Sequence, residues 1–197
     1  MATQISESNI RQLTEELNQQ VSGEVRFDKM SRALWSTDAS IYQIEPVGVV
    51  LPKSTEDVIA VVETAKNYGV SVLPRGGGTS LAGQTVGESI VIDFSRYMRE
   101  VTEINTEEGW VKTQPGIILD ELNEILSPHG VLFSPDPSTS NRGNVGGALG
   151  NNSCGAHSVM WGKTVDNVYD LDVILSDGSQ ASFGQLTGEQ LEVKMRR

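Results

Sequence analysis

Glycine, threonine and serine stand together near residue 80, where the chain reads Arg75-Gly76-Gly77-Gly78-Thr79-Ser80. Consecutive backbone N–H groups that no side chain obstructs form a concave set of donors, and such a set binds phosphate oxygens well. Thr79 and Ser80 add two hydroxyl donors. The pattern predicts a site for a diphosphate.

The two common nucleotide-binding motifs do not match this run. A P-loop would continue with Gly-Lys-Ser or Gly-Lys-Thr, and the Rossmann fingerprint would place a third glycine where Leu81 stands. Taken alone, three glycines indicate a tight turn or a mobile loop as readily as a ligand site. The choice between these interpretations depends on the rest of the sequence.

Glycine is clustered in a second part of the chain as well. Twenty of the 197 residues are glycine, which is above the ordinary ~7%, and they gather around 76–87 and 143–162. The stretch 134–164 is rich in Ser, Asn, Gly and Pro and almost free of periodic apolar residues. A loop of this length is unusual inside a compact domain. We therefore expect it to have a ligand or a special backbone role.

Short motifs in a fixed order extend from residue 38 to residue 178. Together they resemble the FAD-binding domain of the vanillyl-alcohol oxidase / p-cresol methylhydroxylase (PCMH-type) superfamily, and within it the FAD-linked D-lactate, glycolate and D-2-hydroxyglutarate dehydrogenases. The matching segments are Asp38-Ala39-Ser40 with Tyr42, residues 46–52, residues 74–84, Gln114-Pro115-Gly116, residues 135–155, Gly162 with Asp166-Asn167-Val168, and Asp177-Gly178. The expected diphosphate ligand is therefore FAD.

The resemblance implies two groups of FAD-binding residues. Those around the pyrophosphate and part of the isoalloxazine ring are Arg75, Gly76, Gly77, Gly78, Thr79, Ser80, Gly83 and Gln84. Those on the ribityl and flavin side are Pro135, Asp136, Ser140, Gly143, Gly146, Gly147, Asn151, Ser153 and Gly155. By this interpretation the glycines let main-chain atoms approach the cofactor, and the short polar side chains bond its oxygens.

Other implications of the resemblance concern attachment and missing parts. Some members bind FAD covalently through a histidine in the glycine loop, whereas this chain has Gly77-Gly78-Thr79, so non-covalent FAD is expected. The run 151–157 resembles the long members, in which an iron–sulfur region follows the flavin domain. The catalytic residues are expected downstream of Arg197: a carboxylate-binding arginine and metal-binding or proton-accepting histidines.

The activity that the resemblance implies is oxidation of a small 2-hydroxy acid to a 2-oxo acid by hydride transfer to FAD. Two alternatives stay open: an oxygen-using FAD oxidase on the same scaffold, and a catalytically inert FAD-binding or assembly fragment. The sequence does not identify the electron acceptor.

Three single residues have competing interpretations. Cys154 could be a redox thiol, but a small buried residue beside the ring is favoured. His157 could approach the cofactor edge or donate to a loop carbonyl, and the loop role is favoured because no histidine or carboxylate stands at a recognisable ligand spacing from it. Arg75 could neutralise the pyrophosphate or form a structural ion pair. No metal site is predicted.

The elements that must position the first glycine run follow from local patterns. Ile10, Leu13, Leu17 and Val21 have helical spacing. A strand is expected at 46–52, then a helix capped by Ser54, with an apolar face at Val58, Val61, Val62 and Ala65 and a stop at Gly69. Strands at 70–73 and 89–93 enclose the glycine run.

The second half is expected to be richer in strands. Residues 101–104 and 110–113 predict one hairpin, and residues 171–175 and 180–183 predict another. Between them a helix with Leu119, Leu122, Ile125 and Leu126 stops at Pro128 and Gly130, and residues 187–197 begin a last helix.

These elements predict an α+β PCMH-type fold of two α+β subdomains, truncated at the C-terminus as the N-terminal part of a larger protein. The expected parts are 1–45, an N-terminal helix and lead-in; 46–96, the first FAD-binding subdomain; and 97–197, an incomplete second subdomain with a larger, mainly antiparallel sheet.

Composition narrows the classes of partner. The net charge of −11 and the pI near 4.6 repel nucleic-acid phosphates and anionic lipids. No segment approaches the ~20 apolar residues of a transmembrane helix. One cysteine suits a reducing compartment. We expect a cytoplasmic protein with a small-molecule substrate, peripheral at the membrane in its intact form.

Overall fold

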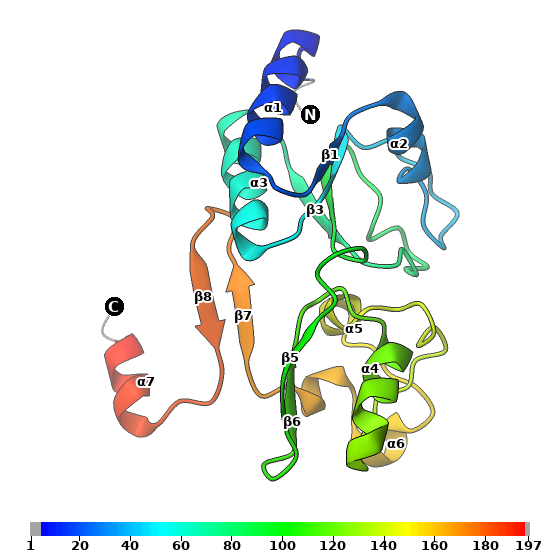
Figure 1. Ribbon diagram of the computed structural model, residues 1–197, viewed down its shortest axis with the longest axis vertical. Helices are drawn as coiled ribbons and strands as arrows, with labels where there is room; N and C mark the ends of the chain where they lie inside the picture. The colour runs from blue at the N-terminus through cyan, green and yellow to red at the C-terminus, as the bar shows by residue number, and fades with distance from the viewer. Residues whose placement is uncertain (1–4, 196–197) are drawn as a thin grey trace.

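A four-stranded mixed sheet forms the first half of the computed structural model, which describes residues 5–195 (Figure 1). Its order is β1-β2-β4-β3; β1 is antiparallel to β2, while β2 and β3 run parallel to β4. The strands are β1 (Glu24–Arg26), β2 (Gly48–Leu51), β3 (Val72–Arg75) and β4 (Ile90–Asp93). Every residue of β2 and β4 is buried, as expected for central strands covered on both faces.

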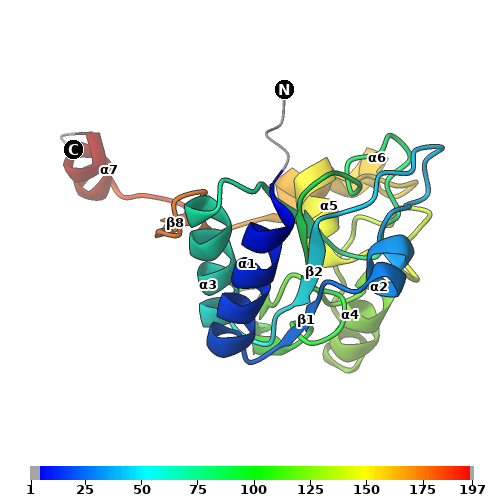
Figure 2. The ribbon, with the colours of Figure 1, turned by 90° about the horizontal axis from the view of Figure 1, so that it is seen from above.

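Two helices, α1 (Glu7–Gln20) and α3 (Thr55–Asn67), lie side by side over one face of this sheet (Figure 2). Their buried side chains form one core with alternate residues of the strands: Leu13, Leu17, Val58, Val61, Ala65, Val50, Ile90 and Ile92. The other face packs Val49, Leu51 and Val91 against Trp35, Leu73 and Tyr97. The predicted apolar faces of both helices are confirmed.

The ends of α3 form as the sequence predicts. The Ser54 hydroxyl accepts a 3.2 Å hydrogen bond from the N–H of Asp57, and Gly69 ends the helix with φ of +67°, where glycine has no steric cost. The Asp57 carboxylate does not return to Ser54. It accepts from the N–H and hydroxyl of Ser22 and from the N–H of Lys53, and so ties α3 to the segment that precedes β1.

Strand β1 and helix α2 (Lys29–Leu34) were not predicted from the sequence. A three-residue strand and a six-residue helix are too short for apolar periodicity to reveal. Because β1 pairs with β2, residues before position 45 contribute to the same sheet as residues after it. The division into 1–45, 46–96 and 97–197 stays a prediction.

The predicted hairpin and helix of the second half are confirmed. The hairpin consists of β5 (Val101–Asn105) and β6 (Trp110–Thr113), and the helix is α4 (Leu119–Leu126), followed by the 3₁₀ turn η1 (Ser127–His129). Leu119, Leu122 and Leu126 form a second core with Val145 and Ala148, covered by Val101, Ile104 and Val111 of the hairpin.

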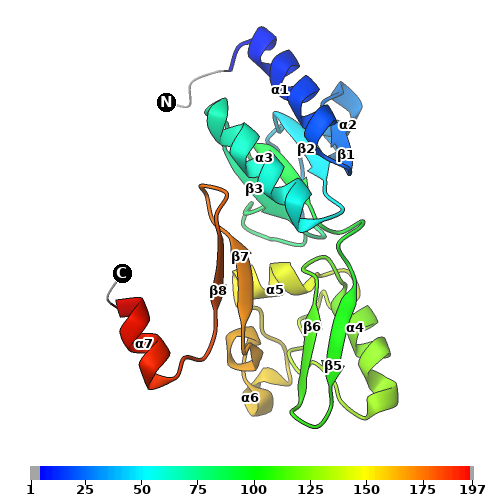
Figure 3. The same cartoon turned by 60° about the vertical axis from the view of Figure 1, so that its left-hand side comes forward.

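The hairpin of β7 (Leu171–Ile174) and β8 (Gln180–Phe183) is also confirmed, but the larger antiparallel sheet is wrong. Within the described residues the two hairpins are separate two-stranded sheets. No described strand lies between them to supply the backbone pairing that a continuous sheet requires. An ion pair links them, Lys112–Asp172 at 3.2 Å, and Ile174 packs on the first core. Figure 3 shows the β7–β8 tip reaching α3.

The stretch 134–164 is not one long loop. It contains α5 (Val145–Asn151) and α6 (Ser158–Trp161), and η2 (Thr164–Asn167) begins at its end. The sequence of α5 is Val-Gly-Gly-Ala-Leu-Gly-Asn, and glycine disfavours a helix interior by about 1 kcal/mol, which hid the element. Val145 and Ala148 are buried one turn apart, so tertiary packing outweighs this propensity.

The last helix, α7 (Gly188–Met195), forms as predicted and lies apart from the rest of the chain (Figures 2 and 3). Its expected continuation through Arg197 lies outside the described residues.

Candidate functional site

The two glycine-rich clusters meet at one pocket of about 50 Å³ between the sheet and the second core. From the first cluster it is lined by Gly76, Gly77, Gly78, Thr79, Ser80 and Thr85, and from the second by Pro137, Thr139, Gly143, Asn144, Gly147, Ala148, Asn151 and Ser153, with Leu119 of α4. The structure therefore brings together residues about 70 positions apart in the sequence.

Nine of the residues implied by the resemblance line this pocket, and eight do not. The eight outside the lining are Arg75, Gly83, Gln84, Pro135, Asp136, Ser140, Gly146 and Gly155. The lining residues that sequence reasoning missed are Thr85, Leu119, Pro137, Thr139, Asn144 and Ala148.

The first side of the pocket is rich in hydrogen-bond donors. Gly77, Thr79 and Ser80 make no hydrogen bond within residues 5–195, through either backbone or side chain. Backbone N–H groups almost always have a partner in a folded protein, from the chain, from water or from a ligand. Three N–H groups and two hydroxyls are thus available to an anion, which fits a pyrophosphate.

The second side presents one acceptor. Asn144 is only 3% exposed. Its amide nitrogen donates to the carbonyl of Gly116, whereas its Oδ1 is buried without a partner. That oxygen lies against the glycine loop, because a Cβ built on Gly76 would come within 2.6 Å of it.

The glycines fall into two physical classes. A Cβ on Gly77 would overlap the Arg142 carbonyl, and one on Gly155 would overlap the Asp136 carbonyl. Those two glycines let two chain segments pack together. Gly147, by contrast, has nothing within 4 Å of its Cβ position, so its backbone is open on the pocket side. The expectation that glycines admit the cofactor stays a prediction.

Arg75 has a structural role that differs from both earlier interpretations. Its guanidinium donates to three backbone carbonyls: Trp35 at 3.1 Å, Thr85 at 3.0 Å and Thr37 at 2.7 Å. Within the described residues it has no carboxylate ion-pair partner. Burial lowers the pKa of the guanidinium, while the charges of Asp93 and Asp38 act in the opposite direction. Through these hydrogen bonds Arg75 links the start of the glycine loop to residues 35–37 and to Thr85.

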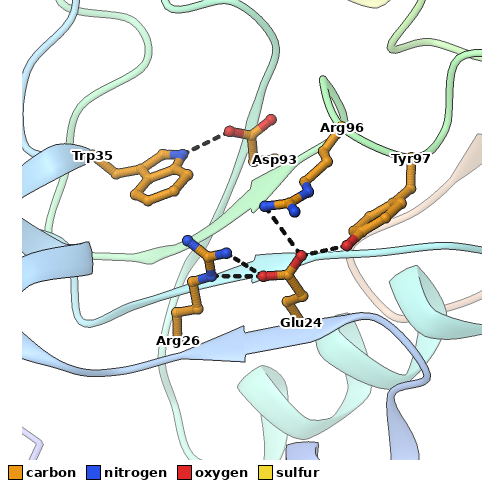
Figure 4. A network of polar contacts seen from close by, with 6 residues as sticks. All are labelled: Glu24, Arg26, Trp35, Asp93, Arg96 and Tyr97. Carbon is orange, nitrogen blue, oxygen red and sulfur yellow. Dashed lines mark hydrogen bonds and ion pairs between the residues drawn. The ribbon is translucent and has the colours of Figure 1, made fainter.

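Polar contacts lie around Trp35, whose backbone carbonyl accepts a hydrogen bond from Arg75 (Figure 4). The indole N–H of Trp35 donates to the Asp93 carboxylate at 2.6 Å. On the same face, Glu24 accepts from Tyr97 and Arg26 and pairs with Arg96 at 3.2 Å. The hydrogen bonds from Tyr97 and Arg26 lower the pKa of Glu24. The Trp35 carbonyl is thereby held in place for Arg75.

His157 pairs with a carboxylate that no ligand spacing in the sequence indicated. Its Nδ1 lies 2.8 Å from Asp136 Oδ2, and its backbone N–H donates to Oδ1 at 2.9 Å. The partners are 21 residues apart, a spacing that matches no local motif. The Trp161 ring lies 5.1 Å from the imidazole.

Cys154 is exposed, so the expectation of a buried residue is also wrong. Its neighbours Ser153 and Gly155 are partly buried, and in an extended segment alternate residues face opposite sides.

No group of three or more His, Cys, Asp or Glu side chains within 5–195 is placed to hold a metal ion. No helix in this range is both long and apolar enough to cross a lipid bilayer.

Curated relatives share much of this sequence. The chain is 42% identical over 168 residues to D-2-hydroxyglutarate dehydrogenase of Escherichia coli K12, a match that covers 83% of this chain and 16% of the relative. It is 32% identical over 163 residues to glycolate oxidase subunit GlcD of Bacillus subtilis 168, covering 81% and 35%. The chain thus spans about a sixth of the length of the D-2-hydroxyglutarate dehydrogenases it matches.

Solved structures share the fold. An alkyldihydroxyacetonephosphate synthase superposes with a TM-score of 0.77 at 24% identity, over 98% of this chain and 40% of that one. A xylooligosaccharide oxidase from Myceliophthora thermophila C1 superposes with a TM-score of 0.74 at 26% identity, over 87% and 37%.

A family model described as an FAD binding domain matches residues 46–184, which include both sides of the pocket. The α+β fold and the resemblance to the PCMH-type FAD-binding domain are confirmed. This chain belongs to the FAD binding domain family.

Proposed function

We propose that this chain is the FAD-binding part of a flavin-dependent oxidoreductase that oxidises a 2-hydroxy acid to the 2-oxo acid. The observation that carries the proposal is the pocket between the two glycine-rich clusters, with free donors on one side. The relatives named D-2-hydroxyglutarate dehydrogenase, D-lactate dehydrogenase and glycolate oxidase support a substrate of that class.

The pyrophosphate of FAD is assigned to the N–H groups of Gly77, Thr79 and Ser80 and to the hydroxyls of the last two. Phosphate oxygens only accept hydrogen bonds at neutral pH, so a set made of donors alone matches them. Arg75 is proposed to position this loop through the hydrogen bonds of its guanidinium to three backbone carbonyls.

The pocket is much smaller than the cofactor. Its volume of about 50 Å³ compares with roughly 300–1,000 Å³ for sites that enclose a drug-sized ligand. These residues therefore hold only a part of FAD. The flavin ring is proposed to lie on the side of Gly147, Asn151 and Ser153, with further contacts from outside the described residues.

The chemistry that bound FAD supplies is acceptance of a hydride from the α-carbon of the hydroxy acid. The described residues bind and orient the cofactor. We propose that substrate binding and acceptance of the hydroxyl proton depend on residues downstream of Arg197.

The decisive experiment is anaerobic titration of the purified full-length protein. We expect a flavin absorbance spectrum that D-2-hydroxyglutarate, D-lactate or glycolate bleaches, while L-2-hydroxyglutarate, the matched control, does not. A colourless protein whose spectrum ignores added FAD would overturn the proposal. Admitting oxygen then separates the two enzyme classes, since only an oxidase is reoxidised quickly without an added electron carrier.

FAD is proposed to be bound non-covalently, because the glycine loop has no histidine or cysteine. Acid precipitation of the protein should leave the yellow colour in the supernatant. Colour retained in the pellet would contradict this proposal.

Iron–sulfur clusters are proposed for the intact protein, on the resemblance of residues 151–157 to the long members. Iron and acid-labile sulfide should then accompany FAD in the purified protein. A cytoplasmic protein, peripheral at the membrane, is proposed as well, and fractionation of cell lysate with a salt wash tests it.

A further inference from the structure

Asn144 occupies a position where its side-chain oxygen normally has a defined partner. It is the N-cap residue of α5, and an N-cap asparagine ordinarily accepts a hydrogen bond from the N–H of the second or third helical residue. No such bond forms here. The amide is instead turned so that Nδ2 donates to Gly116.

This orientation leaves Oδ1 beside the glycine loop without a donor. Asn144 is only 3% exposed, and its Oδ1 has no hydrogen-bond partner within the described residues. The oxygen lies beside Gly76 and Gly77, and the residue lines the pocket. A buried acceptor without a partner is unfavourable, so a donor from a ligand would be favoured at this point.

The required chemistry excludes the phosphates. Their oxygens are acceptors, and an acceptor facing an acceptor is repulsive. In a dinucleotide each end of the diphosphate is esterified to a CH₂ group, and sugar carbons just beyond that group carry hydroxyls, which can donate. The amide N–H of the flavin ring lies farther from the phosphates than these hydroxyls.

We propose that Asn144 Oδ1 accepts a hydrogen bond from a sugar-type hydroxyl of FAD immediately next to the pyrophosphate. This inference rests on the proposed FAD-binding function. It divides the pocket into a donor side, Gly77 to Ser80, for the phosphate oxygens, and a single acceptor for the adjoining polyol. Such a division fixes which way the cofactor runs across the loop.

The test uses FAD analogues on the wild-type full-length protein depleted of its flavin. One set lacks single ribityl hydroxyls (2′-, 3′- or 4′-deoxyribityl FAD), and the other lacks single ribose hydroxyls of the adenosine. We expect one analogue to bind about tenfold more weakly than FAD, the loss of one hydrogen bond. Its identity distinguishes the ribityl chain from the ribose.

A variant of Asn144 completes the test. In Asn144→Leu the tenfold difference between FAD and that analogue should disappear, while Asn141→Leu, an exposed asparagine of the same segment, should keep it. Because Asn144→Leu also removes the bond to Gly116, a variant that fails to fold leaves the wild-type analogue series as the test.

Two negative results have different meanings. If every deoxy analogue binds wild-type protein as tightly as FAD, the assignment of Asn144 is wrong, although FAD binding stands. If FAD itself does not bind to the wild-type protein, the proposed FAD-binding function is wrong, and the assignment of Asn144 is wrong with it.

Discussion

The guanidinium of Arg75 donates a 3.0 Å hydrogen bond to the backbone carbonyl of Thr85, so the first residue of the glycine loop holds a residue near its end. The same side chain bonds the carbonyls of Trp35 and Thr37. A second link is backbone to backbone, from the N–H of Ala39 to the carbonyl of Gly78 at 3.0 Å. The loop is therefore held in shape by the chain before any cofactor binds.

Arg75→Lys should weaken FAD binding about tenfold or more, since a lysine ammonium lacks the planar fork that reaches three carbonyls. Fluorescence titration of flavin-depleted full-length protein measures the change. Arg142→Lys is the matched control, because that side chain is exposed and, within residues 5–195, bonds only its neighbour Asn141. Equal affinities for Arg75→Lys and wild type would refute the role given to Arg75.

Thr79→Val should raise the dissociation constant of FAD about five- to tenfold without lowering the melting temperature. Valine keeps the shape of threonine but removes the hydroxyl assigned to the phosphate, a loss of about 1 kcal/mol or somewhat more. Thr106→Val, on the exposed turn of β5–β6, serves as the control. An unchanged dissociation constant for Thr79→Val would show that this hydroxyl does not bind the phosphate.

Gly147→Ala and Gly155→Ala should have opposite effects on stability. Gly147 lies in α5 with open space at its Cβ position, so alanine should stabilise the fold by roughly 0.5–1 kcal/mol while obstructing FAD. Gly155→Ala would overlap the Asp136 carbonyl and should destabilise by about 2 kcal/mol or more. Gly150→Ala, also with open space, controls for helix propensity alone.

Thermal unfolding and FAD titration together check this pair of variants. A loss of stability in Gly147→Ala equal to that in Gly155→Ala would contradict the division of glycines into packing and ligand-facing classes.

Asp57→Asn should destabilise the protein at neutral pH by about 2 kcal/mol, the range for hydrogen bonds to a charged group. Burial alone would raise the pKa of Asp57, but hydrogen bonds from Lys53 and Ser22 lower it below its ordinary value of 3.8. The stabilisation is thus complete above about pH 4 and is lost as the pH falls through the lower pKa of the folded state.

Urea unfolding of wild type and Asp57→Asn between pH 7 and pH 2.5 checks the sign. The two free energies of unfolding should converge at the acid end. Glu107→Gln, an exposed carboxylate on the turn between β5 and β6, is the control, and a gap that stays constant with pH would show that the Asp57 charge is not involved.

Helices and strands with strong local signals were predictable from the sequence. Ser54 and Gly69 mark the two ends of α3, and its buried face repeats with helical period. The hairpins depend on turns with glycine at positive φ, at Gly109 and Gly178, which are equally local. Such elements can be predicted because the contacts that stabilise each one lie within a few residues along the chain.

α5 could not be predicted, because its glycines oppose a helix and only the packing of Val145 and Ala148 on α4 compensates. The partners of Arg75 and His157 are likewise invisible to spacing rules, at 40 and 21 residues along the chain. Asn144 had one available signal, its place before a run of small helical residues, but the direction of its amide depends on Gly116, 28 residues away.

The sequence by itself determined the chemical character of the site: two glycine-rich segments with hydroxyl and amide side chains, in an order that resembles an FAD-binding domain. Only the tertiary structure decided which of those residues face one pocket, which glycines leave room for a neighbouring backbone segment, and that Arg75 donates to three backbone carbonyls. The physical reason is that residue types and local spacing can be read directly from the sequence. Hydrogen bonds and close contacts between distant segments exist only once both cores have formed.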